Sequence, residues 1–382
     1  MQIAIDVAGF SATEADQLRQ AMGSKRSALR MLKIQQRLYE GMFARGVSPE
    51  VADRIYAQLA AFANYGFPES HAVSFAYLVY ASAWFKLHHP EAFLAGLLNA
   101  QPMGFWSPQS LVADARRHGV IVHGAHVNSG RAHAGVVDDA AAPHGYAVRL
   151  GVGAIRGIGS ALARVIEEGR PYASLDELAR HTHARADQLE RLATAGACRG
   201  IGVFSDAGGE ILHRRQSIWA LGALATPGEE RLAGIGVGAT PPALRPMDSR
   251  EETVADLSMT GIALGEHPLA QLREMLGARG VLPIAELATT ASTKVLIAGI
   301  ITHRQRPGTA SGMVFLNVED EGALTNVICS PGFWLRYRRE LLCAGIIVRG
   351  RLERAHGVIS VVAERAEELI LDAGSWRSRD FH

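Results

Sequence analysis

Apolar positions recur every three to four residues from the start of the chain to about residue 100, which is the spacing of one helix face. Ser48 and Pro49 mark the start of one such helix, because serine caps helix N-termini and proline fits the first turn. A further helix is expected from about residue 70 to His88. It is apolar nearly all round, so we expect it to lie deep in its domain.

Short helices and glycine-marked turns follow between residues 151 and 202. Gly157, Ile158 and Gly159 place an apolar residue between two glycines directly before a helix, which is the signature of a helix-hairpin-helix motif. Glycine lets the hairpin backbone approach a phosphate, and the first N–H groups of the next helix donate to it. Such a motif holds the DNA backbone without reading base sequence. A helix turn without a ligand has the same local pattern, so that alternative stays open.

Residues 174 to 202 repeat this outline. Ser174 is expected to cap a helix, Glu177 to complete a capping box, and Gly196 to form the turn. Two such units in tandem favour DNA binding over a purely structural role.

Beyond residue 292 the apolar period becomes two, which is typical of strands. Five strand candidates lie at 294–305, 312–320, 324–330, 344–354 and 358–365, with a helix at 331–341. This is the strand order of an OB-fold barrel, which binds nucleic acid on strands two and three and on the flanking loops. Binding of a protein partner is the alternative.

The loops of this barrel supply candidate DNA contacts. Arg304 and Arg306 are placed in the loop after the first strand, and Arg354 in the turn after the fourth. The acidic triplet from Glu319 to Glu321 is expected to be a solvated hairpin tip, not a two-metal site.

Composition narrows the remaining possibilities. The 382 residues carry a formal net charge of +1, so whole-chain charge indicates neither a nucleic-acid nor a membrane partner. Three widely spaced cysteines fit neither a disulfide framework nor a zinc site, and they favour a reducing, cytoplasmic compartment. No phosphate-binding loop, nucleophile elbow or zinc-protease motif occurs. We therefore expect no catalytic residue and no metal site in this chain.

Three blocks, residues 18–27, 65–93 and 107–120, carry a family resemblance. They resemble the bacterial DNA polymerase III α subunit, and more closely its error-prone, damage-inducible branch. The resemblance implies a multidomain α+β protein with a helical fingers portion, tandem helix-hairpin-helix motifs and a C-terminal OB-fold β-barrel. The implied boundaries are 1–145 for the fingers, 146–205 for the hairpin region, 206–291 for a helical or linker segment, 292–370 for the barrel and 371–382 for a tail.

In this family, polymerisation uses palm carboxylates that hold two Mg²⁺ ions, and the palm precedes the fingers. The resemblance therefore implies that this chain lacks the palm, binds no cofactor and is inactive alone, while Mg²⁺ serves the complete polymerase. It places Arg19, Lys25 and Arg26 near the incoming nucleotide, although Gln20 departs from the family motif. Ser70 and His71 would face the nucleotide and primer end.

The resemblance also implies partners: primed or single-stranded DNA, a Y-family-like accessory protein, a RecA-like factor, and the sliding clamp indirectly. Trp376 and Phe381 in the tail are candidate docking residues, and no barrel pairing should need the tail. The expected function is the DNA-binding part of a translesion polymerase. A stand-alone, non-catalytic DNA-binding or partner-docking protein, or a remnant of a split gene, remains the alternative.

Overall fold

The computed structural model describes most of the chain, and it forms two compact units that are treated separately below. The described residues are 2–22, 27–65, 69–104, 106–204, 212–225, 238–308, 310–355, 357–371 and 379–381. The first unit holds residues 1–84 with the loop 305–314, and the second holds nearly all of the remainder.

Four helices make the core of the first unit: α1 (Gln2–Ala8), α2 (Ala12–Met22), α3 (Ser27–Ala44) and α4 (Pro49–Tyr65). Ser11 caps α2 through its hydroxyl, which accepts from the Glu14 amide at 3.2 Å, while the Glu14 carboxylate accepts from the Ser11 amide at 2.7 Å. Leu18 and Met42 are fully buried between the helices. Gly41 packs so closely on the Ala8 carbonyl that no larger residue fits. The expected helical start of the chain is confirmed.

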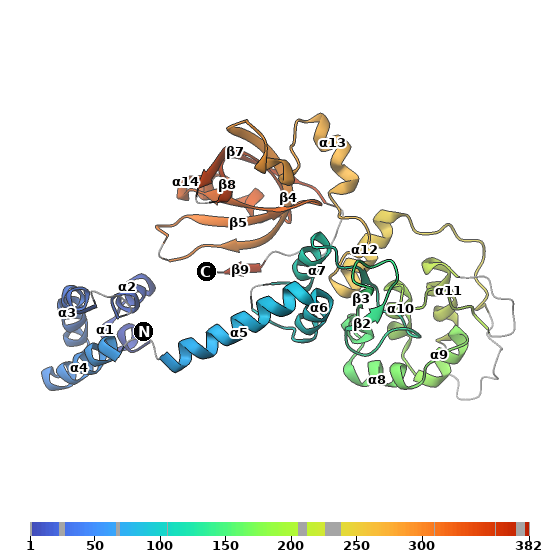
Figure 1. Cartoon of the computed structure of the whole chain (residues 1–382), viewed down its shortest axis with the longest axis horizontal. Helices are drawn as coiled ribbons and strands as arrows, with labels where there is room; N and C mark the ends of the chain where they lie inside the picture. The colour runs from blue at the N-terminus through green and yellow to red at the C-terminus, as the bar shows by residue number, and fades with distance from the viewer. Residues whose placement is uncertain are drawn as a thin grey trace. The chain divides into compact units, whose positions relative to one another are not determined.

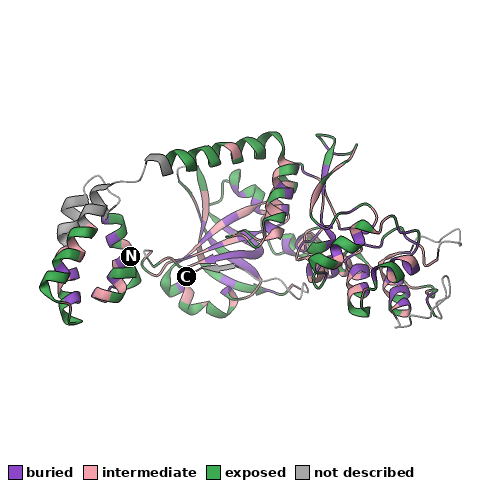
Figure 2. Cartoon of the chain, turned by 90° about the horizontal axis from the view of Figure 1, so that it is seen from below, coloured by how far each residue is buried: buried purple, intermediate pink, exposed green. Residues whose placement is uncertain are grey.

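Helix α5 (Glu69–His88) has the predicted bounds but not the predicted burial. Tyr77 is 74% exposed and Tyr80 is 75% exposed, and most of the helix surface is open in Figure 2. The prediction of a deeply buried helix was therefore wrong for this chain. An all-round apolar pattern shows that a helix suits burial, but it does not show which segment covers it.

The second unit continues with α6 (Pro90–Asn99), α7 (Pro108–Arg117) and a small sheet. The sheet has the order β1-β3-β2, from strands Val122–His123, Tyr146–Arg149 and Gly135–Asp138. A helical layer follows in Figure 1: the short turn η1 (Val152–Ala154), α8 (Ser160–Glu168), α9 (Leu175–Thr182), α10 (Ala186–Thr194), α11 (Arg214–Leu224) and α12 (Ser249–Thr260). Leu150, Ile166, Leu178, Leu192 and Leu221 share one hydrophobic core.

The barrel is reached through η2 (Ala270–Leu272), α13 (Arg273–Ala278) and η3 (Ile284–Ala288). Its strands are β4 (Lys294–Gln305), β5 (Val314–Glu319), β6 (Leu324–Cys329), β7 (Gly345–Ala355) and β8 (Val358–Leu369). The order β5-β6-β8-β7-β4 closes through pairing of β4 with β5. Two short helices, α14 (Pro331–Arg336) and α15 (Arg338–Leu341), lie between the third and fourth strands. All five predicted strands and the helical insertion of an OB fold are confirmed.

The end of the chain adds a strand to the barrel sheet. β9 (Arg379–Phe381) is hydrogen-bonded next to β4. The tail was expected not to be needed for barrel pairing, yet it pairs with β4, whose 12 residues extend beyond what the six residues of β5 can cover. Trp376 lies outside the described residues. Across the described part of the chain, no helix combines the length and apolar character needed to cross a bilayer.

Candidate nucleic-acid interface

The predicted hairpin lies between η1 and α8. Ile158 is buried in the hydrophobic core, whereas Gly157 and Gly159 on either side are exposed. The φ angle of Gly157 is +87°, in the left-handed region that suits glycine, and this turn brings the chain into α8. The buried isoleucine thus fixes the hairpin, and the two glycines present bare backbone to solvent.

The start of α8 is open to a ligand. Gly159 is the N-cap residue, and no side chain caps the helix. A Cβ atom built on Gly159 meets no heavy atom within 4 Å. Ser160 and Ala161 in the first turn are exposed, and the first helical bond is donated by Ala163 to the Gly159 carbonyl at 3.0 Å. The preceding N–H groups of the first turn are the donors that bind phosphate at helix N-termini.

An arginine from another helix completes this hairpin. Arg191 on α10 donates from Nη1 to the Arg156 carbonyl at 3.3 Å, and its Cδ lies 2.8 Å from where a Cβ on Gly157 would be. The side chain of Arg156 is itself exposed. Two cationic side chains therefore flank the bare backbone. Sequence reasoning missed both. Arg156 directly precedes Gly157 and could have been found there, whereas nothing local links Arg191 to residue 157.

The second repeat matches its prediction only in part. Ser174 caps α9, accepting from the Glu177 amide at 3.1 Å, as expected. The Glu177 carboxylate accepts from Ala173 at 2.7 Å, so the capping box is not closed on the N-cap residue itself. The turn between α9 and α10 is formed by His183, with a φ of 48°, and Gly196 instead turns the chain after α10. Helix α10 lies between these two turns, so Gly196 follows the second helix of the repeat.

Two of the three arginines predicted in the barrel loops are in strands instead, Arg304 in β4 and Arg354 in β7, where it is paired with Ile359 of β8. Arg304 lies within β4, is 5% exposed and donates from Nη2 to the Leu341 carbonyl. Its expected place in the loop is wrong, because Arg304 lies inside the strand, whose predicted end at Gln305 is confirmed, and its side chain is buried against the backbone of α15. Arg306 is exposed in the loop. Arg354, at the end of β7, donates from Nη2 to the carbonyls of Leu287 at 2.9 Å and Thr290 at 2.6 Å.

Of the predicted nucleotide-binding residues, Arg19 alone has its side chain within the part of the chain that the structure describes. Arg19 on α2 forms an ion pair with Asp16, with Nε to Oδ1 at 2.8 Å. Lys25 and Arg26 lie outside the described residues. Ser70 and His71 belong to α5, and their side chains are likewise outside the described part of the chain.

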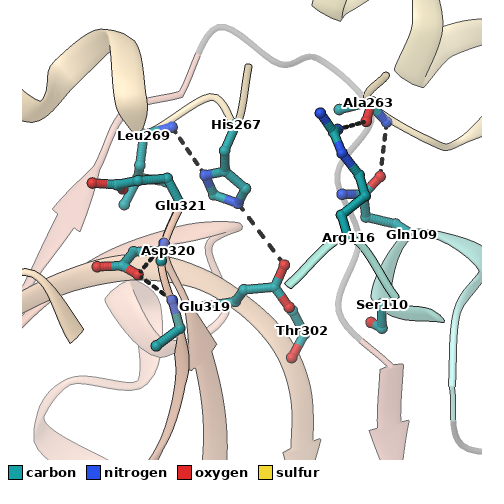
Figure 3. Close-up of polar contacts among 12 residues, drawn as sticks. Gln109, Ser110, Arg116, Ala263, His267, Leu269, Thr302, Glu319, Asp320 and Glu321 are labelled. Carbon is teal, nitrogen blue, oxygen red and sulfur yellow. Dashed lines mark hydrogen bonds and ion pairs between the residues drawn. The ribbon is translucent and has the colours of Figure 1, made fainter. Parts of the chain in front are cut away.

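A buried polar cluster at one end of the barrel was not predicted (Figure 3). Glu319 at the end of β5 is 1% exposed; its Oε1 lies 3.8 Å from Arg117 Nη1 and 4.0 Å from His267 Nε2. Neither carboxylate oxygen has a hydrogen-bond partner among the described residues. Burial raises the pKa of Glu319 to about 7, and burial lowers the pKa of His267 to about 4. Near neutral pH His267 is therefore uncharged, so Glu319 and His267 do not form an ion pair.

The rest of the acidic triplet shapes the same hairpin. Asp320 accepts from the amides of Ile284 at 2.7 Å and of Gly322 and Ala323, both at 2.9 Å. Arg273 forms an ion pair with Asp320, with Nη2 to Oδ2 at 3.1 Å, and a second ion pair with Glu321. The expectation of a solvated tip is wrong for Glu319 and Asp320, because hydrogen bonds to the turn and a guanidinium compensate the buried aspartate. Figure 3 shows them beside the segment that carries His267.

Comparisons with known proteins agree with this geometry. The family model for a helix-hairpin-helix motif matches residues 119–206, and the model for the finger domain of the bacterial DNA polymerase III alpha subunit matches residues 1–46. The error-prone DNA polymerase of Mycolicibacterium paratuberculosis is 52% identical over the full chain. Those of Nocardia farcinica and Corynebacterium diphtheriae are 51% and 43% identical, also over the full chain.

The chain is homologous to a part of the error-prone DNA polymerases. It spans about a third of their length: 34%, 33% and 35% of these three relatives. Among solved structures, the S. pombe Stn1-Ten1 complex aligns with 20% of the chain and 57% of that chain, at 19% identity and a TM-score of 0.17. A likeness this limited adds nothing to the relation with the error-prone polymerases.

Proposed function

We propose that the chain is the DNA-binding, C-terminal part of an error-prone DNA polymerase of the polymerase III α type, acting in translesion synthesis and DNA repair. The observation that carries the proposal is the hairpin of Gly157 and Gly159, with its open helix start and two flanking arginines. The similarity to error-prone polymerases, which extends over the whole of this chain, supports the same interpretation.

In this proposal one backbone phosphate sits at the start of α8. The N–H groups of the first turn donate to it in the favourable field of the helix dipole. Arg191, held by the Arg156 carbonyl, and the exposed Arg156 side chain add charge-assisted bonds to the same strand. All these contacts go to phosphate, so binding is independent of base sequence. The exposed Arg306 of the barrel loop provides a further contact.

The reaction itself belongs to the remainder of the polymerase. Two-metal phosphoryl transfer needs converging carboxylates. Among the residues that the structure describes, no group of three His, Cys, Asp or Glu side chains is arranged to hold a metal ion. We assign the Mg²⁺ ions to the rest of the enzyme and route no chemical step through this chain, whose role is to hold primed or single-stranded DNA.

Partners and compartment extend the same proposal. The partners that fit an error-prone α-type polymerase are a Y-family-like accessory protein, a RecA-like factor and, indirectly, the sliding clamp. The compartment that fits is the cytoplasm. Phe381 lies in β9, next to β4, so docking of the tail would involve a segment already paired with the barrel.

A primer-extension assay separates the proposal from its alternatives. The chain alone is expected to extend no primer, and extension should appear when the remaining part of a relative, such as the polymerase of Mycolicibacterium paratuberculosis, is added. Extension by the chain alone would overturn the assignment. DNA binding without any rescue would identify a stand-alone DNA-binding protein, and absence of both would identify a remnant.

A further inference from the structure

The outer face of strands β4, β7 and β8 carries like charges opposite one another. In the register, Arg349 on β7 faces Arg365 on β8, and Lys294 on β4 faces Arg351 on β7. Directly opposed side chains of an antiparallel pair lie close enough to interact, and like charges there destabilise the sheet. This arrangement is unfavourable for the fold, and an anion bound to the face would relieve the repulsion.

The acidic residues near this face compensate only part of its charge. Glu353 pairs with Arg351 at 2.6 Å, and Glu367 pairs with Arg279 at 2.6 Å. In the described part of the chain, no hydrogen bond or ion pair involves the side chains of Lys294, Arg349 or Arg365. Glu364, the extra residue of the bulge in β8, directly precedes Arg365 in the sequence. The face therefore has uncompensated positive charge.

A groove lies on this face, beside the segment that follows α13. Its volume is about 420 Å³, within the range of ligand sites. Leu282, Leu296 and Ile347 give it an aliphatic floor. Lys294, Arg349 and Arg365 supply its positive charges, and the lining also holds one acid, Glu367, whose carboxylate is paired with Arg279. Leu282 is held in place by its amide, which donates to the Leu296 carbonyl at 2.8 Å. The groove is thus bounded by fixed backbone on its apolar side.

We propose that this basic groove docks an acidic segment of a partner protein, with an apolar side chain anchored between flanking carboxylates. The positive charge favours an anionic ligand, which could be single-stranded DNA or an acidic protein segment. The aliphatic floor distinguishes between these two classes. Single-stranded DNA binds through stacking of bases on aromatic rings, and the lining holds no aromatic residue. A leucine-type anchor instead fills an aliphatic floor, and its carboxylate neighbours reach the arginines.

This inference does not rest on the proposed function, since it concerns a different face from the hairpin. The groove also lies on the first, fourth and fifth barrel strands, whereas nucleic acid binds the second and third strands of OB folds.

The test is a fluorescence-anisotropy titration of the full chain with a short fluorescein-labelled peptide of leucine and aspartate. The peptide is expected to bind, and the double variant Arg349→Glu with Arg365→Glu should weaken binding about tenfold or more. The matched control is Arg338→Glu, which makes the same charge reversal at an exposed position on α15. A peptide with glycine in place of leucine should bind poorly, since it lacks the anchor.

Three results would overturn the proposal. Unchanged peptide affinity in a folded double variant would remove the groove from binding. A labelled oligothymidylate that binds more tightly than the peptide and loses its affinity in the same variant would assign the face to DNA. As a check on folding, Arg365→Gln should reduce peptide binding without lowering the melting temperature, because it relieves the repulsion of Arg349. A lower melting temperature there would show that Arg365 serves the fold and would also contradict the proposal.

Discussion

Replacing Glu319 by glutamine should stabilise the barrel, and more so at higher pH. The carboxylate is buried at the end of β5, facing Arg117 and Asp114 from α7, Asp320 from its own hairpin and His267 from the segment after α12. Glutamine keeps the shape of the side chain and removes its charge. The substitution therefore isolates the cost of ionising a carboxylate that has no hydrogen-bond partner among the described residues.

The magnitude follows from the pKa of Glu319. Burial raises this pKa from 4.5 to about 7, although Arg117 opposes the rise. The folded chain then binds more protons than the unfolded chain between these two values, so stability falls as the pH rises through them. The variant should be more stable by about 1 kcal/mol near pH 5 and by about 3 kcal/mol near pH 8.

His267 adds a second signature. Burial lowers its pKa from 6.5 to about 4, so stability falls as the pH decreases through that interval. In the native chain the contributions of these two groups to the pH dependence oppose each other and largely cancel. In the Glu319→Gln variant only the histidine remains, so stability should rise from about pH 5 to about pH 8.

The assay is urea unfolding at several pH values, followed by pulsed hydrogen exchange of the β5 amides at one labelling pH. This measurement reports on the barrel and not on the helical units. The control is Glu286→Gln, at an exposed acid of η3 whose removal should change the urea midpoint little. A variant that gains no stability near pH 8, or that gains equally at every pH, would refute the reasoning.

Three further changes test other parts of the structure. Arg214→Ala should lower the free energy of unfolding by about 3 to 5 kcal/mol, since it leaves its buried partner Asp256, 2.9 Å away, without a counter-charge; equal urea midpoints would contradict this. Gly157→Val should abolish DNA binding, because residue 157 has a positive φ and a side chain there would meet Arg191. Gly159→Ala should keep the fold, since residue 159 has a φ of −73° and open space around it. Anisotropy measures the binding and circular dichroism the fold, and full binding by a folded Gly157→Val chain would exclude the hairpin as the DNA site. Deletion of residues 379–381 should lower the melting temperature of the barrel, which loses its β9 pairing, and an unchanged value would show that the pairing contributes no stability.

The barrel strands could be predicted because period-two alternation is a local property of the sequence. The same locality explains the misplacement of Arg304. The polar run of Thr302, His303 and Arg304 reads as the end of a strand, yet the barrel buries all three residues. The backbone carbonyl of Leu341 that accepts from Arg304 lies in a different element, and no local pattern reveals it.

The candidate site was predictable only in its backbone. The glycine pair marks the hairpin, but Arg191 reaches it from a helix that folds back in space. The cluster around Glu319 likewise joins residues far apart in the sequence, Arg117 and His267. Burial of helix α5 was predicted from its composition, whereas burial depends on which polypeptide covers the helix.

The measurement that tests the central claim most directly is the salt dependence of DNA binding by the full chain and by Arg191→Ala. The chain should bind primed DNA of unrelated sequences with similar affinity, and log affinity should fall linearly with log salt concentration. Arg191→Ala should reduce that slope by about 1, while Arg338→Ala, on the barrel, should leave it unchanged. Binding that is insensitive to salt, or a slope that Arg191→Ala does not alter, would contradict a phosphate-binding hairpin.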